Sequence, residues 1–395
     1  MNKEDYYGII NFYNKNGNTM STDTKTFIKK IDIITITYYL DDGVYLKIYK
    51  IINKIGSGGS GVVFKILDIT TKKNIDIFNK YSNFIVTNNE YLALKLNTSH
   101  NESHVSSEAL LLIEIFNDTT IPEKYKYFPK FLGIDRLDFM VTPYFGNMNL
   151  ADLVYNLDQK NVLKIPHILN IVLQQLSYYN NKFKHNDIKV TNIVLDENYQ
   201  PKIIDFGLST ADLTDLQDSS LVSFAPEGLL PFIIYKKMNI NIKKFKLKYK
   251  FLFDVKLYAS YDMIGFFWTM IDCFTNNKSH EILKIILQNE NIHYERLYCF
   301  YLRNVDIKKY LTDTYGINNV ELITSFIDVS FVNKVSLNKL IIDRTNPIII
   351  QYLFFNDLDR YNTYLDNMIH LILTPDSEMR ISYKALLINP FFNSV

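Results

Sequence analysis

The sequence predicts an α+β protein, in which a smaller, mainly β half is followed by a larger, mainly α half. Alternating apolar residues flank a glycine-rich turn at residues 45–66, as expected of two strands joined by a turn. Short strand-like runs continue to residue 145, and from about residue 150 the apolar spacing becomes mostly helical. No repeat of fixed period is present, which argues against a solenoid or a propeller.

The expected elements are, in order, an extension without a motif (1–44), two strands around the glycine turn (45–66), a long polar loop (68–90), a strand (91–96), a helix through residue 116 capped by Ser106 or Ser107, two strands (130–134 and 138–145), and helices beginning with 150–157 and 167–183. This order gives a β half and an α half that meet near residue 145.

The composition is that of a globular protein. The chain has 395 residues, of which 47% are hydrophobic and 22% are charged. Lys and Arg together number 43 against 42 Asp and Glu, so no global field attracts nucleic acid or a membrane, and such a partner needs a local basic patch. Only six of the basic residues are Arg, and Ile, Asn, Tyr and Lys are abundant, a bias typical of AT-rich coding.

Targeting and redox features indicate a location inside the cell. The first ten residues carry acids where a signal peptide needs a basic and then an apolar stretch. No apolar run approaches the ~18 residues of a membrane span. The two cysteines, Cys273 and Cys299, are too few for a disulfide framework and lack metal-ligand spacing. We therefore expect a soluble, intracellular and cytoplasmic protein with reduced core thiols.

The glycine-rich run Gly56-Ser57-Gly58-Gly59-Ser60-Gly61 lies at the turn between the first two strands. Because glycine has no Cβ, backbone N–H groups there can come close to phosphate oxygens. The same spacing marks dinucleotide-binding folds, but those need a helix after the glycines, and here residues 62–66 read as another strand. The context argues against a dinucleotide, and leaves open whether the run binds phosphate or only turns the chain.

A lysine on the next strand, Lys95, is flanked by apolar residues. A solvated strand lysine is the simplest interpretation. The alternative is a cation held by a glutamate of the following helix, which would present its charge to nucleotide phosphates. Glu108 is the preferred partner, because it precedes apolar residues at the spacing of a packed helix, and Glu114 is the rival.

The densest polar cluster is His185–Asn192, followed by Asp205-Phe206-Gly207 and Ala225-Pro226-Glu227. Asp187 can accept a proton or orient a hydroxyl group, and Lys189 can neutralise a transferring phosphoryl group. Asn192 and Asp205 supply the hard oxygen ligands that Mg²⁺ prefers.

These residues resemble the motif set of the eukaryotic-type protein kinase superfamily. The chain carries GxGxxGxV at Gly56–Val63, A-x-K ending at Lys95, HxDxKxxN at His185–Asn192, DFG at Asp205–Gly207, APE at Ala225–Glu227, a central-helix segment from Asp262 to Thr275, and a closing segment in which Arg380 is placed to pair with Glu227. The resemblance covers about residues 45–395. It implies a bilobal fold with a mainly β N-lobe at about 45–145 and a mainly α C-lobe at about 146–395.

The resemblance also implies a transferase that binds ATP and Mg²⁺ between the lobes and phosphorylates proteins. The implied catalytic residues are Lys95, held by Glu108, for the α- and β-phosphates, Asp187 for the substrate hydroxyl and Lys189 for the γ-phosphate; the metal ligands are Asn192 and Asp205. Implied nucleotide contacts are Gly56, Ser57, Gly58, Gly59, Ser60, Gly61, Val63, Ala93, Lys95, the hinge residues Pro143 and Phe145 after the gatekeeper Thr142, Asn149 at the ribose, and Val194. In the family, a lysine at the place of Lys189 marks serine/threonine kinases.

Several positions depart from the family pattern. Asn186 stands where most members have an arginine that binds a phosphorylated activation loop, so dependence on that phosphorylation is in doubt. Ser60 replaces the usual aromatic tip of the glycine loop. Hydroxyl groups that remain candidate phosphosites are Ser209, Thr210, Thr214, Ser219 and Ser220.

Three segments exceed the family core, at residues 68–90, 228–261 and 277–360. The second contains eight lysines between Lys236 and Lys256, and its alternation KFKLKYK fits a strand with one basic face. A solvated charged face is the simplest interpretation. The alternative is a docking patch for an acidic protein substrate or, less favoured, for nucleic acid or anionic lipid.

We therefore expect an ATP- and Mg²⁺-dependent serine/threonine protein kinase. The alternatives are a pseudokinase scaffold that binds partners through the fold and the segment 236–256, a small-molecule kinase, and a binding module dominated by that basic segment.

Overall fold

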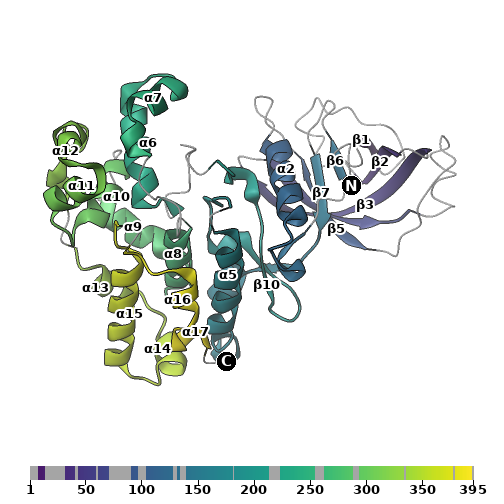
Figure 1. Ribbon diagram of the computed structural model, residues 1–395. Helices are drawn as coiled ribbons and strands as arrows, with labels where there is room; N and C mark the ends of the chain where they lie inside the picture. The colour runs from purple at the N-terminus through teal and green to yellow at the C-terminus, as the bar shows by residue number, and fades with distance from the viewer. Residues whose placement is uncertain are drawn as a thin grey trace. The chain divides into compact units, whose positions relative to one another are not determined.

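The computed structural model describes residues 8–13, 32–40, 43–58, 61–70, 90–96, 104–127, 131–133, 139–180, 182–212, 223–253, 262–287, 293–332, 335–376 and 379–393. The chain divides into two compact units, Met1–Phe145 and Gly146–Val395, both drawn in Figure 1. The first unit is mainly β and the second mainly α, as the sequence predicts.

Within the described residues, the first unit is built on a seven-stranded antiparallel sheet in the order β1-β2-β3-β4-β5-β7-β6 (Figure 1). The strands are β1 Gly8–Tyr13, β2 Ile33–Leu40, β3 Gly43–Gly58, β4 Gly61–Asp68, β5 Tyr91–Leu96, β6 Phe131–Gly133 and β7 Phe139–Pro143. β1 also contacts β6, at the far end of that order, so the sheet curls on itself. Residues 1–44, in which the sequence shows no motif, supply β1 and β2.

The central strands of this sheet follow the period-two burial of a half-covered sheet. Residues Val62, Phe64 and Ile66 of β4 are buried in the core, while the residues between them are only partly buried. The register sets Val63 opposite Lys95. The partly buried residues of β4 and their partners on β5 therefore share the other face of the sheet.

The helix expected after β5 is present as α2, His104–Asn117. It begins two residues before Ser106, so the prediction that Ser106 or Ser107 caps it is wrong, and both serines lie in its first turn. First-turn N–H groups have no partner within the helix, so a serine suits either position and does not by itself fix the start. The single turn η3, Glu123–Tyr125, follows α2.

The second unit combines a small sheet with many helices. Its described sheet has the order β10-β9-β8, with β8 Met148–Asn149, β9 Ile193–Leu195 and β10 Pro201–Ile203. The helices are α3 Leu150–Tyr155, α4 Gln159–Val162, α5 Ile165–Tyr179, α6 Pro226–Met238, α7 Ile242–Lys248, α8 Met263–Phe274, α9 Ser279–Leu287, α10 His293–Leu302, α11 Ile307–Tyr315, α12 Ile317–Thr324, α13 Leu337–Ile342, α14 Pro347–Leu353, α15 Leu358–Ile372, α16 Tyr383–Leu387 and α17 Pro390–Asn393, with single turns η4 Val190–Asn192, η5 Phe206–Leu208, η7 Lys250–Leu252 and η8 Val329–Phe331.

Helix α8 is the core of the second unit, because every one of its residues is buried. A helix that is apolar on all sides must be surrounded by other elements, and α8 contacts α3, α5, α9 and α15. Gly265 lets α8 come close to Ser223 and Ile188, since a Cβ at position 265 would lie 2.8 Å from Ser223 Oγ and 3.0 Å from Ile188 Cβ. α8 is thus packed directly under the segment that carries the polar cluster of the sequence.

The alternation KFKLKYK at residues 244–250 was predicted to be a strand, but most of it lies in a helix, which corrects the prediction. α7 covers Ile242–Lys248, and its anchor Phe245 is fully buried against the rings of Tyr235 and Tyr249. A strand would place Leu247 on the same face as Phe245, yet Leu247 is 82% exposed. Seven residues are too few for alternation to distinguish period 2 from period 3.6, and the i, i+4 pair Phe245–Tyr249 decides for the helix.

None of the helices that the structure describes combines the length and apolar character needed to cross a membrane. The enlarged stretch 277–360 is occupied by α9 to α14 and the start of α15. The loop 68–90 lies outside the described residues from 71 to 89.

Candidate active site

Lys95 on β5 pairs with Glu108 on α2 in the first unit. The lysine Nζ is 2.6 Å from the carboxylate, and the two side chains are only 10% and 3% exposed. Glu114, the rival partner, is exposed to solvent. Removing either member of such a pair would leave a buried charge uncompensated, so the pair fixes the position of the cation. This cation lies on the sheet face that also carries Val63 and Ala93.

The glycine run forms the hairpin turn between β3 and β4. Gly56 pairs with Val63 and Gly58 pairs with Gly61. Gly61 has a φ of 134°, a conformation that side chains other than hydrogen rarely allow. Ser57 is exposed on this hairpin, while Gly59 and Ser60 lie outside the described residues. The glycines stand where the sequence predicts a turn, and their contact with phosphate stays a prediction.

The predicted hinge begins in β7. Thr142 and Pro143 pair with Ala93 and Leu92 of β5, and the ring of Phe145 packs against Tyr127 with centroids 4.9 Å apart. Proline is tolerated at this strand end because its carbonyl group remains available to accept a hydrogen bond. Adenine contacts at Pro143 and Phe145 stay predictions.

In the second unit, Asp262 holds the backbone of the loop at residues 185–192. Its Oδ2 accepts the His185 N–H at 2.8 Å and its Oδ1 accepts the Asn186 N–H at 3.0 Å. Burial raises the pKa of the Asp262 carboxyl group, and the two N–H donors oppose that shift. The bonds hold Asn186 at a φ of 65°, a left-handed conformation that asparagine tolerates better than most residues.

His185 has a positioning role within this loop. It is fully buried, its Nε2 lies 3.2 Å from the Ile204 carbonyl oxygen, and its ring packs on Phe206 with centroids 4.7 Å apart. Burial lowers the pKa of His185, so the imidazole stays neutral near pH 7. A neutral, enclosed imidazole ties the loop to the segment around Phe206.

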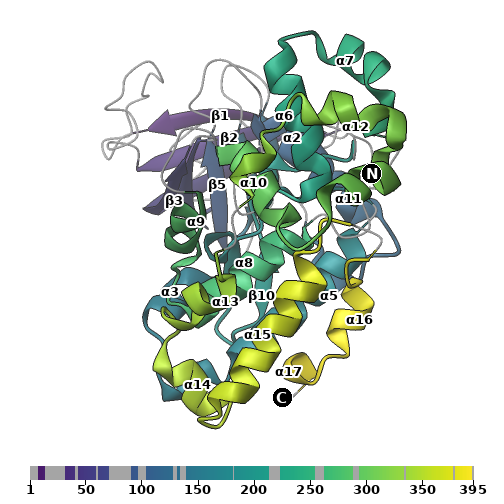
Figure 2. The ribbon, with the colours of Figure 1, turned by 90° about the vertical axis from the view of Figure 1, so that its left-hand side faces the viewer.

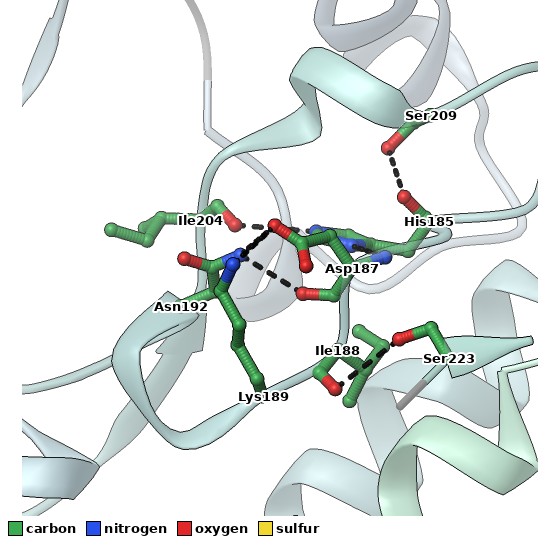
Figure 3. A network of polar contacts seen from close by, with 8 residues as sticks. All are labelled: His185, Asp187, Ile188, Lys189, Asn192, Ile204, Ser209 and Ser223. Atoms are coloured by element: carbon green, nitrogen blue, oxygen red, sulfur yellow. Dashed lines mark hydrogen bonds and ion pairs between the residues drawn. The ribbon is translucent and has the colours of Figure 1, made fainter. Parts of the chain in front are cut away.

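Asp187 occupies the centre of the polar cluster, as Figure 3 shows. Its Oδ2 lies 2.8 Å from Lys189 Nζ and accepts a hydrogen bond from Asn192 Nδ2 at 2.9 Å. Its Oδ1 is buried and has no hydrogen-bond partner among the described residues. A buried acceptor without a partner is costly, and a hydroxyl group brought to Oδ1 would satisfy it.

Asn192 and Asp205 offer oxygen atoms suited to a magnesium ion. The Asn192 amide nitrogen donates to Asp187, so its oxygen points away from Asp187 (Figure 3). The backbone N–H of Ile204 donates to the backbone carbonyl oxygen of Asn192 at 2.9 Å, which ties this loop to the residue before Asp205. The described residues contain no cluster of three His, Cys, Asp or Glu that could hold a metal alone. Two protein oxygens and further ligands from a nucleotide are what Mg²⁺ usually has.

The start of the segment after Asp205 is bound to the 185–192 loop and its neighbour Lys184. The Asn186 side chain donates to the Leu208 carbonyl at 2.9 Å, and Ser209 Oγ donates to the His185 carbonyl at 3.1 Å. Backbone bonds join Lys184 and Thr210 in both directions. Ser209 therefore has a structural partner, and the candidate phosphosites Thr214, Ser219 and Ser220 lie outside the described residues.

Glu227 and Arg380 form a buried bidentate ion pair. Arg380 Nη1 and Nη2 donate to the two carboxylate oxygens at 2.7 and 2.9 Å, and the side chains are 0% and 3% exposed for Arg380 and Glu227. Arg380 Nη2 also donates to the Thr374 carbonyl oxygen. The pair joins the first turn of α6 to the closing segment, as the sequence predicts.

Val194 and Asn149 are register partners in the small sheet. Asn149 caps α3, because its Oδ1 accepts the Asp152 N–H at 2.9 Å. That bond occupies its carbonyl oxygen and leaves the ribose contact a prediction. Gly146 is required nearby, since a Cβ there would lie 2.0 Å from the Leu195 carbonyl oxygen.

Sequence reasoning missed three features that stabilise the site. They are the hydrogen bonds from the loop backbone to the Asp262 carboxylate and the close contacts at Gly146 and Gly265. The signal for Gly265 is present in the sequence, because an isolated glycine inside an apolar helix usually has a packing reason. The bond from Asp262 to His185 joins residues 77 positions apart and leaves no local pattern.

Comparison with known proteins gives a consistent picture. Residues 49–223 match the protein kinase domain family. Over 162 residues the chain is 28% identical to a receptor protein-tyrosine kinase of Arabidopsis thaliana, CEPR1, and 28% identical to mitogen-activated protein kinase kinase kinase kinase 3 of Homo sapiens. These alignments cover 40% and 41% of this chain. Over 106 residues, 25% of the chain, it is 34% identical to receptor-interacting serine/threonine-protein kinase 2 of Bos taurus.

The alignments span 16% to 18% of the relatives' own lengths, and all three relatives are protein kinases by name. The matched range includes the glycine hairpin, Lys95, Asp187 and Asp205. Residues 49–223 are therefore a protein kinase domain of the eukaryotic-type superfamily, and the order of a β unit followed by a helical unit fits that fold.

Proposed function

We propose that the chain is an ATP-dependent serine/threonine protein kinase, which moves the γ-phosphate of ATP to protein hydroxyl groups. The observation that carries the proposal is the state of Asp187, whose Oδ2 is held by Lys189 and Asn192 while its buried Oδ1 lacks a partner among the described residues. That arrangement suits a group that orients an incoming hydroxyl group and takes up its proton.

The proposed reaction distributes its work among residues of this chain. Asp187 orients the acceptor hydroxyl, whose oxygen forms the new bond to the γ-phosphorus as the bond to the β-phosphate oxygen breaks and the hydroxyl proton passes to Asp187. Lys95, fixed by Glu108, binds the α- and β-phosphates, and Lys189 offers its charge to the group in transfer. Asn192 and Asp205 would hold Mg²⁺, which when bound neutralises phosphate charge.

Serine or threonine is the proposed acceptor because of Lys189. Its Nζ lies 2.8 Å from Asp187, beside the oxygen proposed to receive the hydroxyl. In the family, a lysine at this position marks serine/threonine kinases, although the relatives include one named a tyrosine kinase. Phosphoamino-acid analysis of labelled products tests this part, and phosphotyrosine as the main product would refute it.

The main test compares Asp187→Asn with the wild type. The substitution keeps the size and shape of the side chain but exchanges one acceptor oxygen for an NH2 donor and removes the basic carboxylate, so we expect phosphate transfer to fall by about 10² to 10⁴. Asp359→Asn, at an exposed residue of α15, is the matched control and should retain wild-type activity. Transfer from radiolabelled γ-phosphate to the chain itself and to serine peptides is the readout.

Two results would overturn the proposal. Wild-type protein that binds ATP with Mg²⁺ but transfers no phosphate would identify the scaffold alternative. Asp187→Asn protein that keeps most of the activity would reject Asp187 as the residue that receives the proton.

A further inference from the structure

The segment from α6 to η7 gathers positive charge on a folded surface. Residues 228–253 contain seven lysines and neither Asp nor Glu. Lys237 pairs with Glu295 and Lys246 lies 3.1 Å from Asp212. Lys243, Lys244, Lys248 and Lys250 are exposed, and none of them has a carboxylate within ion-pair distance among the described residues.

α7 is held firmly enough to present these charges in a fixed arrangement. The Asn241 side chain accepts the Lys243 N–H and caps the helix. Phe245 packs against Tyr235 of α6 and against Tyr249 and Phe253. Both views of the ribbon show α7 beyond the end of α6, at one extremity of the second unit (Figures 1 and 2).

The outer face of α7 carries an apolar residue among the cations. Leu247 is 82% exposed and lies one helical turn after Lys243 and Lys244, on the same side of the helix. A single exposed leucine is unremarkable by itself. Here it stands among lysines that have no carboxylate partner in the described part of the chain, on a helix fixed by its packing, which is the composition of a docking point for an acidic segment with an apolar residue.

The position of α7 relates this face to the segment that begins at Asp205. The ion pair of Lys246 with Asp212 joins α7 to the segment that begins at Asp205. α6, on which α7 packs, begins at Pro226, directly after the residues Phe224 and Ala225 that end this segment. A substrate bound at α7 would therefore be held beside Asp212 and near the start of α6.

We propose that Lys243, Lys244 and Leu247 form a docking site for an acidic segment of the protein substrate. This proposal rests on the proposed kinase activity for its purpose, but the binding it describes can be measured separately. Charge complementarity favours a carboxylate-rich peptide, and Leu247 favours one with an aliphatic or aromatic side chain over a purely ionic partner such as nucleic acid.

The test uses the full chain and a fluorescein-labelled peptide of Glu residues around one Leu, with a second peptide in which Gln replaces every Glu. Fluorescence anisotropy gives Kd at low and at moderate salt. The variants are Lys243→Glu with Lys244→Glu, and Leu247→Ser. The matched control reverses two exposed helical lysines elsewhere in the unit, Lys284 on α9 and Lys384 on α16, both to Glu.

We expect the Glu peptide to bind more tightly than the Gln peptide, and less tightly as salt rises. The double reversal on α7 should weaken binding at least about tenfold and Leu247→Ser several-fold, while the control keeps the wild-type Kd. Equal Kd values for the two peptides, or equal losses in the α7 and control variants, would overturn the proposal. Tighter binding of an RNA oligonucleotide or of phosphatidylserine vesicles through the same residues would also overturn it.

A kinase assay separates this proposal from the proposed function. A serine peptide extended by the acidic segment should have a higher kcat/KM than the short peptide, and the double reversal should remove that advantage. Absence of phosphate transfer from every wild-type reaction would refute the proposed activity and leave the anisotropy result to decide the docking site. Transfer to both peptides with no advantage for the extended one would refute docking alone.

Discussion

The buried pair Glu227–Arg380 allows a stability prediction with a defined size. In Arg380→Ala, the Glu227 carboxylate, whose side chain is 3% exposed in the wild type, loses two charge-assisted hydrogen bonds of 2.7 and 2.9 Å. Removing one partner of a buried ion pair typically lowers the free energy of unfolding by about 3–5 kcal/mol, because the remaining charge is desolvated and uncompensated. A domain is stable by only about 5–15 kcal/mol, so we expect a large fraction of the stability of the second unit to be lost.

The assay is urea unfolding at pH 7, followed by tryptophan fluorescence. The chain has one tryptophan, Trp268, which is fully buried in α8 of the second unit and therefore reports on the unit that contains the pair. The free energy of unfolding is obtained by linear extrapolation to zero urea. Arg360→Ala, at an exposed arginine on α15, is the matched control and should change stability by less than about 0.5 kcal/mol.

Two further variants separate charge from geometry. Arg380→Lys keeps the positive charge but cannot form the bidentate fork, so its loss should be intermediate. The double variant Glu227→Gln with Arg380→Met removes both charges and should lose less than the sum of the single changes. An Arg380→Ala loss below about 1 kcal/mol, close to the Arg360→Ala value, would refute the reasoning that this pair is a buried and interdependent unit.

Three other predictions concern the close approach at Gly146, a buried carboxyl group and the cation of the first unit. Gly146→Ala should lower the free energy of unfolding by about 1–3 kcal/mol in the same fluorescence assay, because its Cβ would fall 2.0 Å from the Leu195 carbonyl oxygen; an unchanged value would contradict the close contact. Burial raises the pKa of Asp272 to about 6, so the folded state binds this proton more tightly than the unfolded state does. Stability of the wild type relative to Asp272→Asn should therefore rise by up to about 3 kcal/mol as pH falls from 7 to 4, and a difference independent of pH would refute the assignment. Lys95→Met should reduce phosphate transfer by orders of magnitude and Lys95→Arg by less than Lys95→Met, because only the first leaves Glu108 buried without a cation; equal activity of the wild type and Lys95→Met would exclude a role in transfer.

The sequence was informative where chemistry requires particular residues at particular spacing. The cluster around Asp187 and Asn192 depends on short loops in which local geometry determines which side chains meet, and the structure brings these two side chains together. The β half and the α half were likewise predictable, because burial imposes periods of 2 and 3.6 on long segments.

The sequence was uninformative or misleading where tertiary contacts decide. In the lysine-rich segment, alternation suggested a strand, but the aromatic contacts of Phe245 with Tyr235 and Tyr249 stabilise a helix. The hydrogen bond from the His185 N–H to Asp262 connects distant parts of the chain. The isolated glycine at position 265 indicates a close contact, but the sequence does not reveal that the partner is Ile188. Contacts of this kind arise from packing and leave no mark at fixed sequence spacing.

The pairing of β1 and β2 with the rest of the first sheet has a practical consequence for handling the protein. β3 is 16 residues long and β2 pairs along its first part. Removing residues 1–44, which lack any kinase motif, would uncover a row of backbone N–H and C=O groups along β3 and would take away the strand that meets β6. Exposed edges of this kind recruit strands from other molecules, so a shortened protein that begins at the first motif should self-associate, whereas the full chain protects this edge with its own strands.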